Sequence, residues 1–442
     1  MPVFAKLRKS QNSLVQRPDR MMASTFTDEK NTLHPRMSVI SDIPFIDAFI
    51  DQTSADHGAL EKVVTAIRPQ WKGKTITSER FREGICNTVL KCFTQEEEEA
   101  IVVRINGNRV KIFPLQCDPD RVEELKVYQV FRSIGVSPPL LGIFRNGICM
   151  EYIPGRQYTW FDAYYKSSDD PFIRTNMKEL AKYHSNRTSV LAREMGFEES
   201  PAVIVQCRFL LDSLGEEVPD GLDRERLQDA IGPNFKDTLE EELSVLINRC
   251  TSLNLPLVFC HGDVNPTNII FNETTDTVAF VDYETAGFNY AAFELARHIY
   301  LVTCSIHVDI EDRLPSDEFI LEVIRVYLEE RQHVDGSIRA DGDTIQLWYR
   351  HVRTAMLFVF HWQIMFALNW VTNQPMRGVG DEDENTRLVN ELYWTTLSRA
   401  KHYWKLRHEV LNMTIPKQNV ELVRDLPEHD SQDIGLGRCP EI

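Results

Sequence analysis

Short apolar runs separated by polar turns fill the first third of the chain, a pattern typical of β-strands. Residues 100–107 form one such run, and residues 140–144 and 148–153 flank an Arg-Asn-Gly triplet. Asn-Gly between two apolar runs is the strongest short-range signal for a β-hairpin. The pattern therefore predicts a strand-rich N-terminal part, which ends where Pro154 and Gly155 offer a hinge.

Helix-type spacing of apolar residues follows the hinge. The stretches with this period are residues 175–192, 236–250, 317–332, 345–370 and 385–410. A further helix is expected upstream, at residues 45–63. The most apolar long stretch, residues 354–371, contains His361, Gln363 and Asn369, which interrupt the apolar run that a membrane span requires. We therefore expect a buried helix there and no membrane span.

Strands, a hinge and then helices predict an α+β chain with two lobes. The expected division is a flexible N-terminal extension at 1–40, an N-terminal lobe at 41–153, a helical lobe at 154–415 and a C-terminal tail at 416–442. Residues 1–40 mix Ser, Gln, Pro and basic residues without any period, and the last stretch is charged and contains Pro and Gly.

Candidate chemistry lies in the stretch 257–284, near the middle of the helical lobe. An apolar run of strand type ends at Cys260, and a polar loop follows it. Two short apolar segments then flank a turn-rich segment, which predicts a hairpin that runs directly into Asp282. Local folding is therefore expected to bring Asp263, Asn268 and Asp282 together.

These three side chains match the needs of phosphoryl transfer from ATP. A carboxylate must accept the proton of the attacking hydroxyl, and oxygen ligands must hold Mg²⁺ against the phosphates. Protein kinases use H-R-D-x-x-x-x-N followed by a metal-binding Asp, and the step of five residues from Asp263 to Asn268 is the same. The alternative is that Asp263 and Asn268 only make turn hydrogen bonds, while Asp282 caps a helix. We interpret the chain as two-lobed and protein-kinase-like.

An ATP-binding role is expected for two parts of the N-terminal lobe. Apolar residues bracket the polar turn at 84–88, which predicts two strands whose connection can place Asn87 and Thr88 over phosphates. One glycine is far less than a glycine-rich loop, so an ordinary hairpin is equally consistent. By its order along the chain, the backbone around Glu151 and Tyr152 would meet the adenine.

Arg104 is the only charge in the predicted strand at 100–107. Burying it is costly without an acidic partner, and Glu123 and Glu124 come early in the helix expected at 120–131. A basic strand residue paired with an acidic helix residue orients the ATP phosphates in kinases. A purely structural salt bridge is the equally weighted alternative, and Glu124 is the expected partner.

Composition excludes several other classes of function. The chain has 442 residues, 43% of them hydrophobic, and a net charge of −17, which argues against nucleic acid as the main partner. Nine cysteines include no C-x-x-C, so zinc and dithiol motifs have little support and a reducing compartment is favoured. We expect a cytoplasmic location; a mitochondrial transit peptide is the alternative, since the first acidic residue is Asp19.

The residues from Asp282 to His298 read D-Y-E-T-A-G-F-N-Y-A-A-F-E-L-A-R-H and resemble the choline/ethanolamine kinase family. The resemblance extends to Gly-Ile-Cys-Asn at 84–87, to Val-Arg-Ile-Asn-Gly at 103–107 and to Glu-Glu-Leu-Lys at 123–126. A protein kinase is excluded, because the D-F-G and A-P-E motifs and the Arg of the catalytic loop are missing from the sequence.

The resemblance implies ATP- and Mg²⁺-dependent phosphorylation of a small amino alcohol, ethanolamine in particular. It implies that Asp263 is the catalytic base and that Asn268 and Asp282 hold Mg²⁺. Asn265 and Glu284 would lie near the substrate. Alternatives are a choline kinase, a small-alcohol kinase of the aminoglycoside phosphotransferase type and a pseudokinase that serves as a binding module. The oligomeric state stays open, a dimer included.

The chain departs from the family pattern in the predicted amine pocket. Thr285 stands where the family has Tyr, Arg297 where it has Asn, and Leu301 where it has an acid. The family's W-x-x-W pair aligns with Phe366 and Asn369, although Trp362 and Trp370 are close by. An ammonium group is held by carboxylates or aromatic faces. The acceptor is therefore less well specified by the sequence than the catalytic set.

Overall fold

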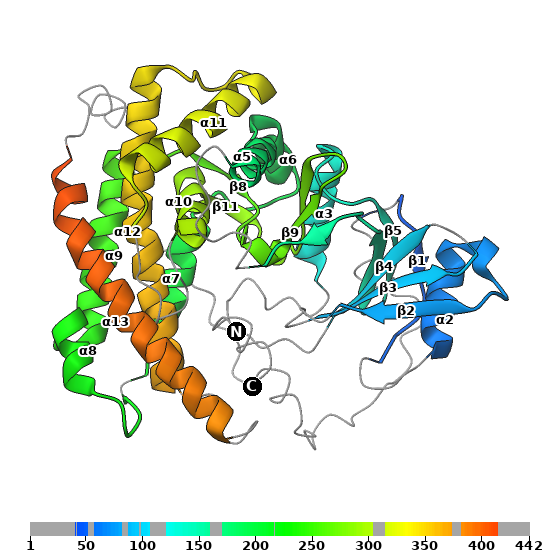
Figure 1. Cartoon of the computed structure of the whole chain (residues 1–442), viewed down its shortest axis with the longest axis horizontal. Helices are drawn as coiled ribbons and strands as arrows, with labels where there is room; N and C mark the ends of the chain where they lie inside the picture. The colour runs from blue at the N-terminus through cyan, green and yellow to red at the C-terminus, as the bar shows by residue number, and fades with distance from the viewer. Residues whose placement is uncertain are drawn as a thin grey trace.

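The computed structural model describes residues 40, 42–51, 57–81, 87–96, 99–106, 121–159, 170–215, 217–303, 314–373 and 382–413. Figure 1 shows a sheet on one side of the molecule, a larger group of helices on the other side, and helix α3 (Val122–Ser133) between them. This arrangement agrees with the predicted order of a strand-rich part, a hinge and a helix-rich part. The expected extension and tail, at 1–40 and 416–442, lie almost wholly outside the described residues.

The N-terminal part is built on a six-stranded sheet of order β1-β5-β6-β4-β3-β2. Its strands are β1 (Phe45–Ile46), β2 (Ile76–Arg80), β3 (Asn87–Thr94), β4 (Ala100–Asn106), β5 (Leu140–Phe144) and β6 (Gly147–Glu151). Strand β1 runs parallel to β5, and the other neighbours in the order are antiparallel. The predicted β5–β6 hairpin is confirmed, with Phe144 opposite Gly147.

The two faces of this sheet bury different residues because side chains alternate along a strand. On β4, Val103 and Ile105 belong to a small core beneath helix α2 (His57–Ile67). Arg104, between them, therefore faces the opposite side of the sheet, where it meets helix α3 (Val122–Ser133). The alternation in the sequence thus places one buried charge on the face that carries α3.

The helix expected at residues 45–63 is wrong in its first half. Phe45 pairs with Ile143 in the sheet, and the Pro44 carbonyl accepts a hydrogen bond from the Ile143 N–H. The described part of helix α2 spans His57–Ile67, and residues 52–56 lie outside the described part. The apolar residues at the start of this stretch suit a buried edge strand as well as a helix face, and pairing with β5 decides between the two.

The helix-rich part consists of α5 (Pro171–Tyr183), α6 (Asn186–Glu194), α7 (Ala202–Asp212), α8 (Arg224–Ile231), α9 (Phe235–Ser252), α10 (Ala291–Thr303), α11 (Asp317–Asp335), α12 (Gly342–Asn373) and α13 (Glu382–Asn412). The helix predicted at 175–192 is two helices, because Ser185 leaves the helical conformation and caps α6 by accepting a hydrogen bond from the Thr188 N–H. Helices α7, α8 and α10 were not predicted.

Helix α12 is the one described helix that is long and apolar enough to cross a membrane, with a mean hydropathy of 1.3. In the structure, 94% of its apolar window is buried inside the protein. Figure 1 shows α12 running through the helical part beside α9, α10 and α13. The prediction of a buried helix at this place is confirmed.

The hinge connects β6 to strand β7 (Arg156–Gln157), which pairs with the predicted catalytic hairpin. Strand β7 pairs with β9 (Ile269–Asn272), and β9 pairs with β10 (Thr277–Phe280). At Gly155, φ is 145° and a Cβ atom would lie 2.5 Å from the Phe271 carbonyl oxygen. A glycine is therefore required where the two parts of the chain meet.

Replacing Gly155 with Ala is expected to destabilise the protein by about 2–4 kcal/mol, because backbone strain and a clash with Phe271 add together. Gly196→Ala is the matched control: Gly196 also has a positive φ, 82°, but nothing lies within 4 Å of its added Cβ. The control is expected to cost only about 1 kcal/mol. Urea unfolding measures both losses, and equal losses would contradict the close packing at the hinge.

Candidate active site

The loop after strand β8 (Leu257–Cys260) arranges its polar side chains around one carboxylate. The Oδ2 atom of Asp263 accepts hydrogen bonds from the side-chain amides of Asn265, at 2.9 Å, and Asn268, at 3.0 Å. The Asn268 amide also donates to the Asp263 carbonyl oxygen at 3.0 Å. Asp263 is partly exposed, so the carboxylate is held in place and still accessible.

Gly262 gives the loop its sharp turn. Its φ is 87°, and a Cβ atom there would collide with the backbone carbonyl of Thr285. The segment after Asp282 therefore packs directly against the loop that carries Asp263. Strand β11 (Gly287–Tyr290) continues this contact by pairing with β8, with Gly287 opposite Cys260.

The β9–β10 hairpin brings Asp282 to the same place, as predicted. Its strands pair from Asn272 opposite Thr277 to Ile269 opposite Phe280, and the Val281 N–H then donates to the Asn268 carbonyl at 2.9 Å. Asp282 comes next, with φ at 72°, a conformation that non-glycine residues seldom adopt. Hydrogen bonds of the main chain thus connect Asn268 to the residue before Asp282.

The Asp282 carboxylate is suited to a cation. Its Oδ1 atom is buried and has no hydrogen-bond partner among the described residues. Burial, followed by repulsion from Glu284, raises the pKa of Asp282 to about 8, although Arg104 acts in the opposite direction. A buried carboxylate oxygen without a donor beside an amide oxygen donor such as Asn268 fits the ligand chemistry of Mg²⁺.

A chain of alternating charges connects the sheet to this site. Arg104 Nη2 lies 2.6 Å from Glu124 Oε1, and Arg121 Nη1 lies 3.2 Å from Glu124 Oε2 and 3.5 Å from Glu284 Oε2. Arg104, Arg121 and Glu124 are buried. Burial acts to raise the pKa of Glu124, but the two guanidinium groups outweigh it and lower the pKa. The predicted pairing of Arg104 with Glu124 is present.

Arg121 was not predicted, and the reason is local. It has φ at 51° and stands immediately before α3, in a left-handed conformation that aims its side chain across the end of the helix. The preceding residues 107–120 lie outside the described part. The sequence offered a basic residue there but no sign of this conformation.

The remaining predicted ATP residues lie on the sheet or, for Tyr152, directly after its strand β6. Asn87 and Thr88 begin β3, and the Arg80 guanidinium donates to Thr88 Oγ1 at 3.3 Å. Glu151 ends β6, and the Tyr152 ring has the Lys91 ammonium 4.5 Å from its centroid. The turn at 82–86 lies outside the described residues. Within the described part, these four predicted residues make no hydrogen bond or ion pair with the Asp263 loop.

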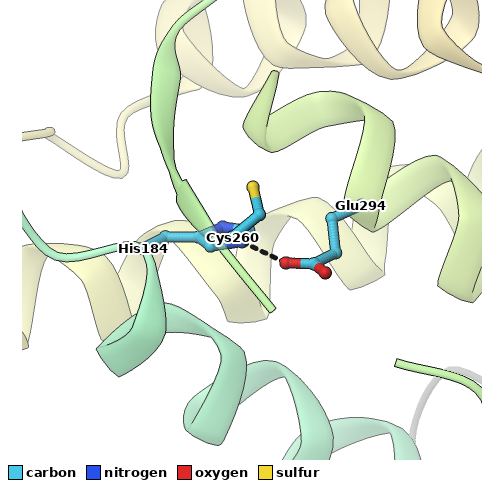
Figure 2. Close-up of side chains that lie close together, drawn as sticks. All are labelled: His184, Cys260 and Glu294. Carbon is cyan, nitrogen blue, oxygen red and sulfur yellow. Dashed lines mark hydrogen bonds and ion pairs between the residues drawn. The ribbon is translucent and has the colours of Figure 1, made fainter. Parts of the chain in front are cut away.

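Glu294, on helix α10, accepts hydrogen bonds from the backbone of the catalytic loop. This role was not predicted. Its Oε1 accepts a hydrogen bond from the Gly262 N–H at 2.5 Å, and its Oε2 accepts one from the His261 N–H at 3.2 Å. The His184 Nε2 atom lies 2.7 Å from Glu294 Oε2 (Figure 2). One buried carboxylate therefore fixes two consecutive backbone groups next to Asp263.

The charge states in this cluster are consistent with a neutral His184 and an ionised Glu294. Burial lowers the pKa of His184. Burial acts to raise the pKa of Glu294, but the hydrogen bonds from His184 and the Gly262 N–H, together with the nearby imidazoles, outweigh it and lower the pKa. His184 then donates from Nε2 to Glu294, and Nδ1 accepts from the Tyr327 hydroxyl at 2.9 Å. The histidine thus links α11 to the loop through Glu294.

The ligand atoms of His184, Cys260 and Glu294 lie within 4.8 Å of one another, a spacing that could hold a metal ion (Figure 2). However, both oxygens of Glu294 and both nitrogens of His184 already make hydrogen bonds. The Cys260 thiol donates to the Asn289 carbonyl at 3.7 Å. We interpret this cluster as structural support of the loop.

The two residues aligned with the W-x-x-W pair, Phe366 and Asn369, lie on helix α12. The Asn369 amide donates to the Leu210 carbonyl at 3.1 Å and to Ser213 Oγ at 2.9 Å, so it is used in packing α12 against the end of α7. Trp362 and Phe366 stack on α12, with centroids 5.2 Å apart. Trp362, one helical turn before Phe366, also lies next to Arg297, which contacts the catalytic loop.

Arg297 connects that tryptophan to the catalytic carboxylate. Its Nη2 lies 2.6 Å from Asp263 Oδ1, and its Nη1 donates to the Gly262 carbonyl at 2.7 Å. Its guanidinium carbon lies 5.3 Å from the centroid of the Trp362 ring. Helix α10 thus contacts the loop through a carboxylate at 294 and, one turn later, through a guanidinium at 297.

Replacing Glu294 with Ala is expected to destabilise the protein by about 2–4 kcal/mol, because the buried N–H groups of His261 and Gly262 lose their acceptor. Chemical unfolding measures this loss. Glu241→Ala is the control, since Glu241 is an exposed residue of α9. If the two variants were equally stable, the support of the loop by Glu294 would be refuted.

Comparison with known proteins gives a consistent result. The family described as choline/ethanolamine kinase matches residues 78–405. The chain is 25% identical to ethanolamine kinase 2 of Mus musculus over 376 residues, which cover 85% of this chain and 87% of that protein. It is 29% identical to ethanolamine kinase 1 of Homo sapiens over 367 residues, covering 82% and 74% of the two chains.

Solved structures agree on the fold. A choline kinase from Cryptosporidium parvum superposes with a TM-score of 0.57 at 17% identity, covering 82% of this chain and 99% of that one. An ethanolamine kinase of Plasmodium vivax superposes with a TM-score of 0.56 at 17% identity, covering 77% and 86%. The predicted two-lobed, protein-kinase-like fold is confirmed. The chain belongs to the choline/ethanolamine kinase family.

Proposed function

We propose that this protein transfers the terminal phosphoryl group of ATP to the hydroxyl of a small amino alcohol, ethanolamine in particular. The observation that carries the proposal is the convergence of Asp263, Asn268 and Asp282 through one loop and one hairpin. The similarity to ethanolamine kinases over most of the chain supports the choice of acceptor.

Asp263 is the catalytic base in this proposal. Its carboxylate is partly exposed and is oriented by Asn265, Asn268 and Arg297, so it is ready to accept the hydroxyl proton as the oxygen attacks phosphorus. Fixing the carboxylate before the substrate arrives avoids an entropy cost during the reaction. Asn265 and Glu284 lie beside this reacting centre, where they would contact the substrate.

Asn268 and Asp282 are the proposed Mg²⁺ ligands. The Asn268 amide nitrogen donates to Asp263, which leaves its oxygen for a cation, and Asp282 Oδ1 is buried without a donor among the described residues. When bound, Mg²⁺ would neutralise the negative charge of the phosphates and orient them. The cation would also offset the repulsion between Asp282 and Glu284.

The N-terminal lobe is the proposed ATP-binding part. Arg104, fixed by Glu124, provides a permanent positive charge on the face of the sheet that carries α3. Asn87 and Thr88 are proposed to contact the phosphates, and Glu151 and Tyr152 to border the adenine. We propose lobes at 41–153 and 154–415, and a cytoplasmic location.

Replacing Asp263 with Asn is expected to lower kcat by roughly 10²–10⁴, because the amide cannot accept the hydroxyl proton. Formation of phosphoethanolamine from ethanolamine and Mg²⁺-ATP, followed by phosphorus NMR, measures this loss. Asp276→Asn, in the exposed turn of the β9–β10 hairpin, is the control and should retain the wild-type rate. Wild-type protein that is stabilised by Mg²⁺-ATP but phosphorylates no amino alcohol would point to a binding module instead.

Replacing Asp282 with Asn is expected to raise the Mg²⁺ concentration needed for half-maximal rate by about tenfold or more, since a carboxylate ligand becomes neutral. A titration of activity with Mg²⁺ at saturating ATP and ethanolamine measures the shift. Asp276→Asn serves again as the control. An unchanged Mg²⁺ requirement would remove Asp282 from the metal site.

A further inference from the structure

The guanidinium of Arg297 contacts both the catalytic carboxylate of Asp263 and the ring of Trp362. Arg297 reaches from α10 to Asp263, 2.6 Å away, and its guanidinium carbon lies 5.3 Å from the centroid of Trp362 on α12. The side chain is 20% exposed. Arg297 therefore forms part of the wall of the site next to Asp263.

Three contacts hold Arg297 in this position. One nitrogen pairs with the Asp263 carboxylate, another donates to the Gly262 carbonyl at 2.7 Å, and the planar group lies over an indole ring. Arginine suits such a site because its planar guanidinium binds oxygens and aromatic faces at once and keeps its charge. Its position is thus set by the surrounding structure and differs from that of a mobile surface arginine.

The guanidinium of Arg297 affects the binding of a trimethylammonium and of a primary ammonium differently. A trimethylammonium has no N–H to donate, so it is recognised mainly by aromatic faces. Arg297 already covers the face of Trp362 beside Asp263. A primary ammonium instead donates up to three hydrogen bonds to oxygen atoms, and Glu284, proposed above as a substrate contact, offers a partly exposed carboxylate in the same site.

We propose that Arg297 is a specificity-determining residue that makes the acceptor site select primary amino alcohols over N-trimethylated ones. The inference rests on the proposed function, because it concerns the acceptor of the same reaction. Arg297 excludes the trimethylammonium group by occupying the aromatic face that would hold it, whereas its positive charge acts on both kinds of ammonium group. Specificity of this kind comes from a contact that disfavours the wrong substrate.

The role differs from simple orientation of Asp263. Asn265 and Asn268 already donate to its Oδ2 atom, so the carboxylate has two neutral donors without Arg297. Loss of orientation alone would lower the rates with all acceptors by the same factor. Loss of specificity would instead change the ratio of the rates, which separates the two roles.

The test compares kcat/KM for ethanolamine, its N-methyl and N,N-dimethyl derivatives and choline. For the wild-type chain, kcat/KM is expected to fall with each added methyl group. In Arg297→Asn, the ratio of kcat/KM for choline to that for ethanolamine should rise about tenfold or more, equivalent to about 1.4 kcal/mol. Arg297→Lys keeps a positive charge and should show a much smaller rise.

A second substitution tests whether the ring of Trp362, uncovered in Arg297→Asn, causes the rise in the choline-to-ethanolamine ratio. In the double variant Arg297→Asn with Trp362→Leu, the choline-to-ethanolamine ratio of kcat/KM should return to the wild-type value, because the aromatic face is gone. Thermal unfolding of each variant with and without Mg²⁺-ATP confirms that it is folded. If Arg297→Asn does not fold, the Lys variant and Trp362→Leu alone still test the proposal, since removing the ring beneath Arg297 should leave the wild-type ratio unchanged.

The outcomes separate the inference from the proposed function. Turnover of ethanolamine with the same choline-to-ethanolamine ratio in wild type and Arg297→Asn overturns the specificity role and leaves the proposed function intact. A higher kcat/KM for choline than for ethanolamine in the wild-type chain would also overturn the specificity role and leave the proposed function intact. No turnover of any amino alcohol by any variant overturns both.

Discussion

The hydrogen bonds from the backbone of His261 and Gly262 to the buried carboxylate of Glu294 are the contact on which the site depends. They attach the catalytic loop to helix α10, which packs on the central helix α12. A buried carboxylate is stable only when its partners satisfy it. Here His184 and two N–H groups do so, and Asp263, the next residue along, therefore has a defined position.

The rest of the site is connected to this loop by short segments of chain. The hairpin returns Asp282 beside Asn268 through one main-chain hydrogen bond, and Gly262 lets the backbone of Thr285 approach closely. A series of ion pairs then connects this segment to strand β4 of the six-stranded sheet, from Glu284 through Arg121 and Glu124 to Arg104. The proposed metal site and the proposed ATP-binding lobe are thus electrostatically coupled across the hinge.

Much of this could be predicted from the sequence, since the determining signals are local. The hairpin that joins Asn268 to Asp282 spans few residues, and the alternation along β4 isolates Arg104 on one face. Glu294 and Arg297 could not be assigned from the sequence, because their roles depend on how α10 packs beneath a loop some thirty residues earlier. Arg297 was visible only as a departure from the family pattern.

The error at Phe45 has a related origin. Phe45 entered a strand instead of a helix because a distant strand pairs with it, and short apolar runs do not distinguish a helix face from a buried strand. The phase of a long helix relative to its neighbours is likewise a tertiary property. The contact of Trp362 with Arg297 therefore depends on how α12 packs against α10.

The central claim is that the loop and the hairpin form one centre for phosphoryl transfer, with Asn268 and Asp282 as metal ligands. Electron paramagnetic resonance of Mn²⁺, added in place of Mg²⁺ together with ATP, tests it most directly. We expect hyperfine coupling of the bound Mn²⁺ to phosphorus in the wild-type chain and its loss in Asp282→Asn. Coupling of the same strength and an unchanged Mn²⁺ affinity in that variant would show that Asp282 does not hold the metal.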